Sequence, residues 1–159
     1  MSAARFLPHD AWLQVVASAP LVSIDLIVRD GEGRVLLGLR KNEPARGLWF
    51  TPGGVIRKNE TLDAAFARIA DAELGLSLRR SDARLLGVHE HLYDSNFAGA
   101  ANIGTHYVVL AHEVAAPAAM ADLPASQHQE WRWMSVPALR AAPDVHDYVK
   151  RYFASAVAA

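Results

Sequence analysis

The chain has 159 residues, of which 52% are hydrophobic and 21% charged, and its formal net charge at pH 7 is −1. This length suits one domain spanning residues 1–159, and the composition is typical of a globular protein rather than a disordered or membrane one. The near-neutral charge excludes a global basic field for nucleic acid, so an anionic ligand must be held by local arginines. The absence of cysteine excludes disulfides and cysteine-ligated zinc or iron–sulfur sites.

The predicted elements alternate between short strands and a few helices. Strands are expected at residues 21–28, 35–40, 49–52, 85–91, 106–114 and 131–134. A first helix at 8–17 buries Trp12 and Val16, and a central helix at 61–74 ends before Gly75. A C-terminal helix is expected from the apolar spacing of Val145, Tyr148, Val149, Tyr152, Phe153 and Ala156.

This order of elements predicts a mixed α/β (α+β) layered fold, with a sheet packed between helices. Two connections stand out, a polar loop at 94–104 and an Ala- and Pro-rich loop at 115–125, which we expect to be flexible. Polar residues interrupt the N-terminal apolar stretch, which disfavours a signal peptide, and no run reaches the ~20 apolar residues of a membrane helix. We therefore expect a soluble cytoplasmic protein.

The central helix places an acidic side chain at the end of an apolar stripe. Three apolar residues fall within about 60° of Glu73 on a helix of this pitch, namely Leu62, Phe66 and Ile69. A carboxylate on the edge of a buried face is costly unless it is paired or metal-bound, and the negative end of the helix dipole adds to that cost. Glu73 is therefore a candidate magnesium ligand, with exposure to water or pairing with an arginine as the alternative.

Residues 54–76 resemble the Nudix box, a signature of hydrolases that act on a nucleoside diphosphate linked to another group. The box reads G-x5-E-x7-R-E-U-x-E-E-x-G-U, where U is apolar. The matching positions are Gly54, Glu60, Arg68, Glu73, Gly75 and Leu76. Two box carboxylates are replaced by Ile69 and Ala72. Because those acids bind metal and help to activate water in ordinary members, the resemblance implies a change of chemistry here.

The reduced box resembles that of one Nudix branch, the GDP-mannose mannosyl hydrolases. The likeness extends through the stretches PLVSID (20–25), LLGLR (36–40), GLWF (47–50), PGG (52–54), HLYD (91–94), THYVVL (105–110), QH (127–128) and WRW (131–133). It implies the Nudix fold and hydrolysis of GDP-mannose, or a related GDP-sugar, with cleavage of the sugar C1–O bond and inversion at C1. It also implies a homodimer and one Mg²⁺ per subunit, for which Mn²⁺ can substitute.

The resemblance also assigns the metal ligands and the general base. The implied Mg²⁺ ligands are the Gly53 carbonyl, Glu73 and Gln127, completed by diphosphate oxygens. Magnesium takes oxygen ligands and retains waters and substrate phosphates, so one carboxylate with neutral donors suits it. His128 is the implied general base, because glycosyl transfer to water needs a proton acceptor and a histidine can accept a proton near neutral pH. The alternative for residues 127–129 is a polar surface loop.

Other residues match substrate-side positions of the branch. Arg40 is expected to contact the diphosphate, and Arg40 and Tyr107 are expected to serve catalysis as well as binding. Asp25 and His91 are expected to bind the substrate on the sugar side. For each of these four residues the alternative is a surface charge or a polar core residue with its hydrogen bonds satisfied.

Two arginines near the box leave alternatives open. Arg68 is a catalytic candidate that contacts either the diphosphate or Glu60, and it is structural if it only pairs with Glu60. The branch carries an arginine where this chain has Val55, and Arg57 is the candidate replacement as a substrate-binding residue.

Two other functions remain open at this point. An ordinary Nudix pyrophosphatase would release GMP and a sugar phosphate, with Glu90 as a surrogate base. A non-enzymatic nucleotide-sugar binding module would need no base. The joint presence of four residues argues against it, namely Arg40, Glu73, Gln127 and His128. In all three cases the expected partner is a small-molecule nucleotide sugar, with no nucleic acid and no membrane.

Overall fold

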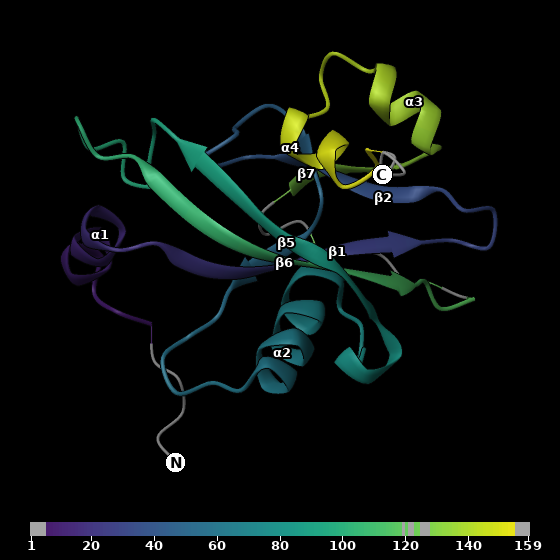
Figure 1. The fold of residues 1–159 in the computed structure, drawn as a ribbon, viewed down its shortest axis with the longest axis horizontal. Coiled ribbons are helices and arrows are strands. Elements are labelled where there is room, and N and C mark those ends of the chain that lie inside the picture. Colours follow the sequence, from purple (N-terminus) through teal and green to yellow (C-terminus); the bar gives the residue numbers. More distant parts are fainter. Residues whose placement is uncertain (1–5, 119, 121–122, 125–127, 155–159) are drawn as a thin grey trace, which may run out of the picture.

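The computed structural model describes residues 6–118, 120, 123–124 and 128–154, which contain one seven-stranded mixed sheet (Figure 1). The strands are β1 Leu21–Arg29, β2 Val35–Arg40, β3 Trp49–Phe50, β4 Gly53–Val55, β5 Arg84–Tyr93, β6 Thr105–Ala115 and β7 His128–Met134. Their order is β3-β2-β1-β6-β5, and β4 pairs with β1 while β7 pairs with β2. Only the pairing of β1 with β6 is parallel among these strands.

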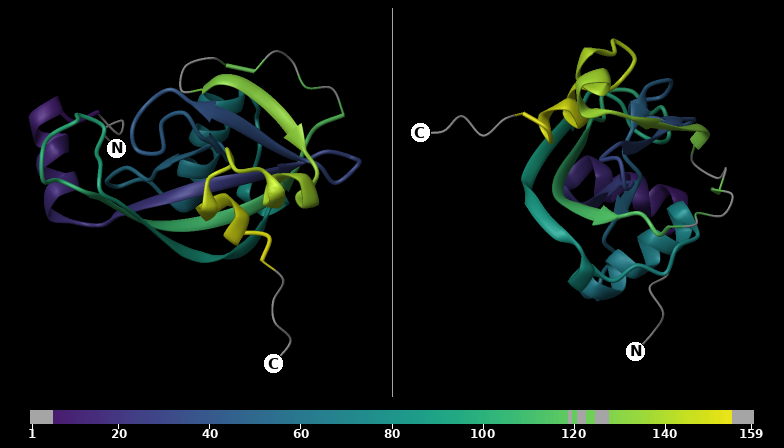
Figure 2. Two further views of the ribbon diagram at one scale, coloured as in Figure 1. Left: turned by 90° about the horizontal axis from the view of Figure 1, so that it is seen from above. Right: turned by 90° about the vertical axis from the view of Figure 1, so that its right-hand side faces the viewer.

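Helices cover both faces of this sheet, so the expected sheet between helices is confirmed (Figure 1). The helical elements are α1 His9–Ser18, α2 Leu62–Leu74, η1 Arg80–Asp82, α3 Val136–Ala141 and α4 Asp147–Arg151. One hydrophobic cluster joins α2 to β1, and a second joins α3 and α4 to the opposite face of the sheet. Figure 2 shows α1 at one end of the sheet, beside the loop that connects β5 and β6.

The central helix α2 begins and ends as its sequence predicts. The Thr61 hydroxyl accepts a hydrogen bond from the backbone N–H of Ala64, and Gly75 adopts the left-handed conformation with φ 66° just past the last turn. Phe66 and Ile69 are buried as expected, but Leu62 is 41% exposed and does not extend the stripe. A side chain in the first turn points back towards the helix N-terminus, which carries Leu62 past the packed face.

The prediction of one long C-terminal helix is wrong. The backbone of residues 144–146 bonds to Trp49 instead, and Val145 forms a parallel bridge with it. The side chain of His146 then caps α4, which has only five residues. Three elements were not predicted, namely the short strand β4, the short 3₁₀ helix η1 and the helix α3, which is capped by Ser135. No helix in the described part of the chain is long and apolar enough to cross a bilayer.

Candidate active site

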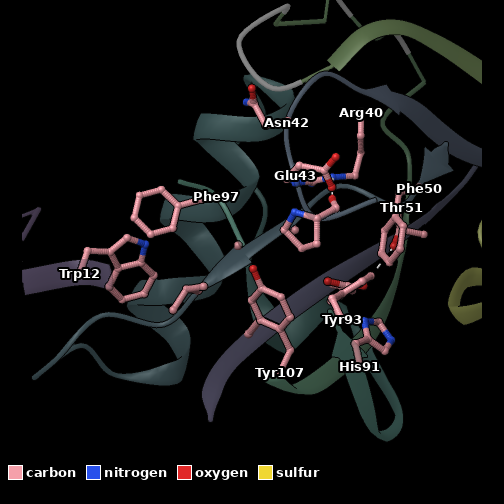
Figure 3. Close-up of a pocket in the computed structure, with 16 residues that line it drawn as sticks. Trp12, Arg40, Asn42, Glu43, Phe50, Thr51, His91, Tyr93, Phe97 and Tyr107 are labelled. Carbon is pink, nitrogen blue, oxygen red and sulfur yellow. Dashed lines mark hydrogen bonds between the residues drawn. The ribbon is translucent and has the colours of Figure 1, made fainter. Parts of the chain in front are cut away.

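A pocket of about 440 Å³ lies beside β1, and α1 and the loop at residues 94–104 contribute to its wall (Figure 3). Five of the predicted site residues line it, namely Asp25, Arg40, Gly53, His91 and Tyr107. Strand pairing explains this convergence. Asp25 lies opposite Gly53 in the β1–β4 pair, and His91 lies opposite Tyr107 in the β5–β6 pair.

Asp25 is a buried acid at the centre of a hydrogen-bond group. Its Oδ2 accepts hydrogen bonds from the hydroxyls of Tyr152 at 2.5 Å and Thr51 at 3.2 Å. Burial raises the pKa of Asp25 to about 6, although the bonds from Tyr152 and Thr51 and the charge of Arg40 act to lower it. The carboxyl group is therefore mostly ionised at neutral pH, which suits it to accept a hydrogen bond from a substrate hydroxyl.

His91 and Asp25 both contact the hydroxyl of the same tyrosine, Tyr152. Its Nε2 is 3.1 Å from the Tyr152 hydroxyl, and its ring stacks on Tyr148 with centroids 4.3 Å apart. Burial lowers the pKa of His91 to about 3, with smaller contributions from neighbouring positive groups, so the ring is neutral at pH 7. Because the single hydroxyl proton of Tyr152 is donated to Asp25, the Nε2 of His91 carries the proton that it donates to Tyr152.

Tyr152 is a site residue that sequence reasoning missed. The spacing places it only on an apolar helix face, and it is in fact 9% exposed within the core. The one signal for a polar role is that a buried tyrosine hydroxyl needs a hydrogen-bond partner. Its two partners, Asp25 and His91, lie on β1 and β5, and no local sequence pattern predicts that these two strands lie near Tyr152.

Arg40 and Tyr107 supply hydrogen-bond donors to the pocket. The Nε of Arg40 donates to the carbonyl of Pro44 at 2.9 Å, which fixes the guanidinium in the pocket wall. Burial raises the pKa of Tyr107, so its hydroxyl stays protonated at neutral pH and can donate. Tyr93, another lining residue that was not predicted, packs edge to face against Tyr107 with centroids 6.0 Å apart.

Glu73 and His128 form a second, buried pair that is not part of the pocket lining. Glu73 Oε2 lies 3.4 Å from His128 Nε2, and the two residues are 5% and 1% exposed. The His128 ring packs on Gly38 and lies 4.6 Å from the Trp131 ring, and neither ring nitrogen has a hydrogen-bond partner among the described residues. His128 lies opposite Arg40 in the β2–β7 pair, and Arg40 lines the pocket, so the pair adjoins the pocket. The expected inward position of Glu73 is confirmed.

These residues fit a single hard cation better than a cluster of metals. The described residues hold no group of three His, Cys, Asp or Glu side chains that could bind a metal, so a cation must rely on Glu73 and neutral oxygens. Among the described residues, His128 is the one polar contact of the buried Glu73 carboxylate. A buried carboxylate with so little compensation fits Mg²⁺. The predicted ligand Gln127 lies outside the described residues.

Arg68 forms hydrogen bonds within the box and does not line the pocket. Its Nε and Nη2 donate to the two carboxylate oxygens of Glu60 at 2.6 and 2.8 Å, and Nη2 also donates to the Val55 carbonyl at 2.9 Å. The hydrogen bond from Arg68 lowers the pKa of Glu60. This bidentate pair matches the structural alternative for Arg68.

The expected replacement of an arginine by Arg57 is not supported by its position. Val55 lines the pocket where the branch carries an arginine, whereas Arg57 is not among the lining residues. The Arg57 guanidinium instead lies 4.2 Å from the ring of Phe6. Glu90 is also outside the lining, since its exposed side chain lies 3.7 Å from His106.

The two box positions without carboxylates have different surroundings. Ile69 is 1% exposed and packs on Gly54. A methyl group added to Gly54 would lie 3.1 Å from Cγ1 of Ile69. Ala72 is exposed to solvent. The helix α2 therefore directs one carboxylate, Glu73, towards the site.

Comparisons with known proteins agree with this architecture. A sequence model of the NUDIX domain matches residues 19–155. The chain is 42% identical over 146 residues to the low-salt glycan biosynthesis protein Agl8 of Haloferax volcanii, covering 92% of this chain and 88% of that protein. It superposes on a MutT NUDIX hydrolase from Burkholderia pseudomallei with a TM-score of 0.69 at 25% identity, covering 85% of this chain and 96% of that one. The MutT protein of Methanosarcina mazei Go1 superposes with a TM-score of 0.67 at 19% identity, covering 86% of this chain and 92% of that one. This likeness shows a shared fold alone.

Proposed function

This chain belongs to the Nudix family of hydrolases, and we propose that it hydrolyses GDP-mannose, or a closely related GDP-sugar, to GDP and the free sugar. In the proposal, water attacks C1 of the sugar, the C1–O bond breaks and the configuration at C1 inverts. The name of the Haloferax relative, a glycan biosynthesis protein, is consistent with a substrate that carries a sugar.

The observation that carries the proposal is the single inward carboxylate of α2, with a histidine against it. Glu73 contacts His128 at 3.4 Å, while Ile69 fills the position of another box carboxylate by packing on Gly54. The helix therefore offers no second acid to activate a water molecule for attack on phosphorus. Within the part of the chain that the structure describes, neither ring nitrogen of His128 has a hydrogen-bond partner, which makes His128 the available proton acceptor beside the pocket.

The pocket residues then have separate roles. Arg40 holds the diphosphate through its guanidinium, which suits phosphate oxygens. Asp25, His91 and Tyr107 contact sugar hydroxyls and keep C1 in line with the water that loses its proton to His128. Arg68 acts at a distance, because its pair with Glu60 fixes the loop between β4 and α2.

Glu73, the Gly53 carbonyl and Gln127 would hold one Mg²⁺, or Mn²⁺ in its place. When bound, the cation neutralises negative charge that develops on the departing GDP, in place of an acid that protonates the leaving group. We also propose that the chain is a homodimer, and light scattering of the purified protein tests this directly. A monomer mass would reject that part of the proposal.

Product analysis tests the reaction. The protein is incubated with GDP-mannose and Mg²⁺, the nucleotides are separated by anion exchange, and the sugar is followed by proton NMR. GDP with mannose appearing first as the β anomer is expected, because the substrate is α-linked and the reaction inverts. GMP with mannose phosphate would identify a pyrophosphatase and reject the proposal.

Two histidine variants test the base. His128→Gln is expected to lower kcat by ~10²–10⁴-fold with little effect on substrate binding, the usual size of a lost general base. His112→Gln is the matched control, since His112 is equally buried but packs on Phe66 away from the pocket lining. Equal turnover per folded molecule in the two variants would remove His128 from the mechanism.

A further inference from the structure

The ring of His91, which lines the pocket (Figure 3), is stacked on a residue that does not line it. The rings of His91 and Tyr148 are almost parallel, with an angle of 3° between their planes and centroids 4.3 Å apart. Phe50 and Tyr93 contact the same imidazole edge to face, with centroids 5.8 and 6.3 Å away. Among the aromatic rings that the structure describes, only that of Tyr148 therefore lies parallel to the imidazole.

One side of the C-terminal helix α4 supplies two contacts to His91. Tyr148 and Tyr152 are four positions apart, so they lie on the same side of the helical turn. The Tyr148 ring covers the imidazole, while the Tyr152 hydroxyl lies 3.1 Å from Nε2. The backbone N–H of His146 donates to the carbonyl of Trp49 at 3.1 Å, and α4 begins at the next residue. Both tyrosines therefore come from a segment that is fixed to β3 where it starts.

The position of Tyr148 is fixed by its own neighbours. Its hydroxyl donates to the carbonyl of Leu92 at 2.8 Å and accepts from the N–H of Leu92 at 2.9 Å, on the edge strand β5. Its ring stacks on the ring of His146 with centroids 4.8 Å apart, and Nδ1 of His146 accepts from the backbone N–H of Tyr148 at 3.1 Å. The two hydroxyl bonds are exposed and water can replace them, so the ring contacts supply most of the constraint.

The orientation of the His91 ring matters because its two nitrogens have different roles. Nε2 donates to Tyr152, which leaves Nδ1 of the neutral ring as a hydrogen-bond acceptor. Burial lowers the pKa of His91 to about 3, so the ring does not take up a second proton at neutral pH. A half-turn of the ring would place a carbon beside the Tyr152 hydroxyl in place of Nε2. A fixed ring is therefore a condition for the contact with a sugar hydroxyl that the proposed function assigns to His91.

We infer that Tyr148 is a positioning residue, whose ring holds the imidazole of His91 in the orientation that binds the sugar of the substrate. The inference rests on the proposed function in that it takes the substrate to carry a sugar. Tyr148 is not among the residues that line the pocket, so it acts through His91 and not on the substrate. The inference requires the ring of Tyr148 and not its hydroxyl, which distinguishes it from simple anchoring of α4 to β5.

NMR of the imidazole nitrogens tests the inference without turnover. The protein, which has seven histidines, is labelled with ¹⁵N-histidine, and the signals of His91 are identified by their absence in His91→Asn. Wild type and Tyr148→Phe are expected to show His91 as a single tautomer protonated at Nε2 at pH 7. Tyr148→Leu lacks the flat face, so averaged tautomers or exchange-broadened signals are expected. A single Nε2-protonated tautomer in Tyr148→Leu would overturn the inference.

Steady-state kinetics and GDP binding supply the second measurement. Tyr148→Leu is expected to lower kcat/KM for GDP-mannose roughly 2- to 13-fold, the size of one aromatic pair, whereas Tyr148→Phe keeps the wild-type value. The Kd for GDP, which lacks the sugar, is expected to stay at the wild-type value in both variants. Wild-type kcat/KM in Tyr148→Leu, or an equal weakening of GDP binding, would contradict a role on the sugar side.

Two further variants separate positioning from folding. Phe153→Leu is the matched control, because Phe153 belongs to the same C-terminal segment, is half-buried against the core and Arg29, and does not line the pocket. It is expected to keep the wild-type kcat/KM and the wild-type tautomer of His91, and a loss as large as that of Tyr148→Leu would reject the inference. Tyr148→Met replaces Tyr148→Leu if the latter does not fold, since methionine fills space with a flexible chain and offers no flat face.

The measurements distinguish failure of this inference from failure of the proposed function. If GDP-mannose is not converted into GDP and mannose, the proposed function fails. The NMR measurement needs no substrate, so it then still decides whether Tyr148 holds the His91 ring. If GDP-mannose is hydrolysed as proposed but Tyr148→Leu matches wild type in kcat/KM, the positioning role alone is rejected.

Discussion

Gly38 of β2 lies against the ring of His128, so Gly38→Ala tests the catalytic importance of that ring's position. A methyl group on Gly38 would lie 2.3 Å from Nδ1, 2.4 Å from Cγ and 3.0 Å from Cβ of His128. Carbon contacts are favourable near ~3.5 Å, so the ring must move by about 1.2 Å or the strands must separate. The ring cannot yield freely, because it is 1% exposed and packs on Trp131 and Glu73.

This displacement has two expected consequences. Overpacking of a tight site costs ~1–3 kcal/mol of unfolding free energy, which urea unfolding measures. A reacting group misplaced by about 1 Å can lower the rate by ~10²-fold, so kcat for GDP-mannose is expected to fall by this order with KM little changed.

Gly31→Ala is the control for both measurements. Gly31 lies in the turn between β1 and β2, and a methyl group there would meet nothing within 4 Å. That variant is expected to keep wild-type kcat and stability. A folded Gly38→Ala protein with the kcat of wild type would refute the reasoning, because the base would then not depend on the ring position.

Three other predictions follow from the site. Glu73→Gln is expected to raise the Mg²⁺ concentration needed for half-maximal activity, and an unaltered metal requirement would reject Glu73 as a ligand. Tyr152→Phe removes the hydroxyl between Asp25 and His91, so kcat/KM is expected to fall roughly 10- to 100-fold. Tyr148→Phe, which removes a hydroxyl that bonds to the β5 backbone, is expected to leave kcat/KM unchanged. Because His91 titrates near 6.5 when unfolded but has a pKa of about 3 when folded, the unfolded state binds more protons below pH 6.5 and stability falls as pH falls. Urea unfolding measures this effect. Between pH 7 and 5, the free energy of unfolding of His91→Asn is expected to fall by about 2 kcal/mol less than that of wild type. Equal decreases in the two proteins would contradict the neutral, buried state of His91.

Local sequence signals predict the central part of the site well. Thr61 and Gly75 bound α2 because a hydroxyl cap and a left-handed glycine act within a few residues. Helical periodicity places Glu73 on the inward edge for the same reason. Resemblance to one branch then adds Asp25 and His91, and the structure places these two in one pocket.

Contacts between distant segments escape this kind of reasoning. The hydroxyl of Tyr152 bonds to Asp25 across 127 positions of sequence, and no local pattern encodes that contact. The strand β4 has two glycines with weak intrinsic preference for a strand, and it forms because Val55 pairs with Ser23. The ring of Trp12 lies near that of Phe97, which belongs to a loop far along the chain.

The bond that breaks is the centre of this account, and incubation with GDP-mannose and Mg²⁺ in oxygen-18 water identifies it most directly. Mass spectrometry of the products locates the label. Attack on C1 predicts oxygen-18 in the released mannose and unlabelled GDP. Oxygen-18 in a phosphate group of either product would show attack on phosphorus and contradict the account.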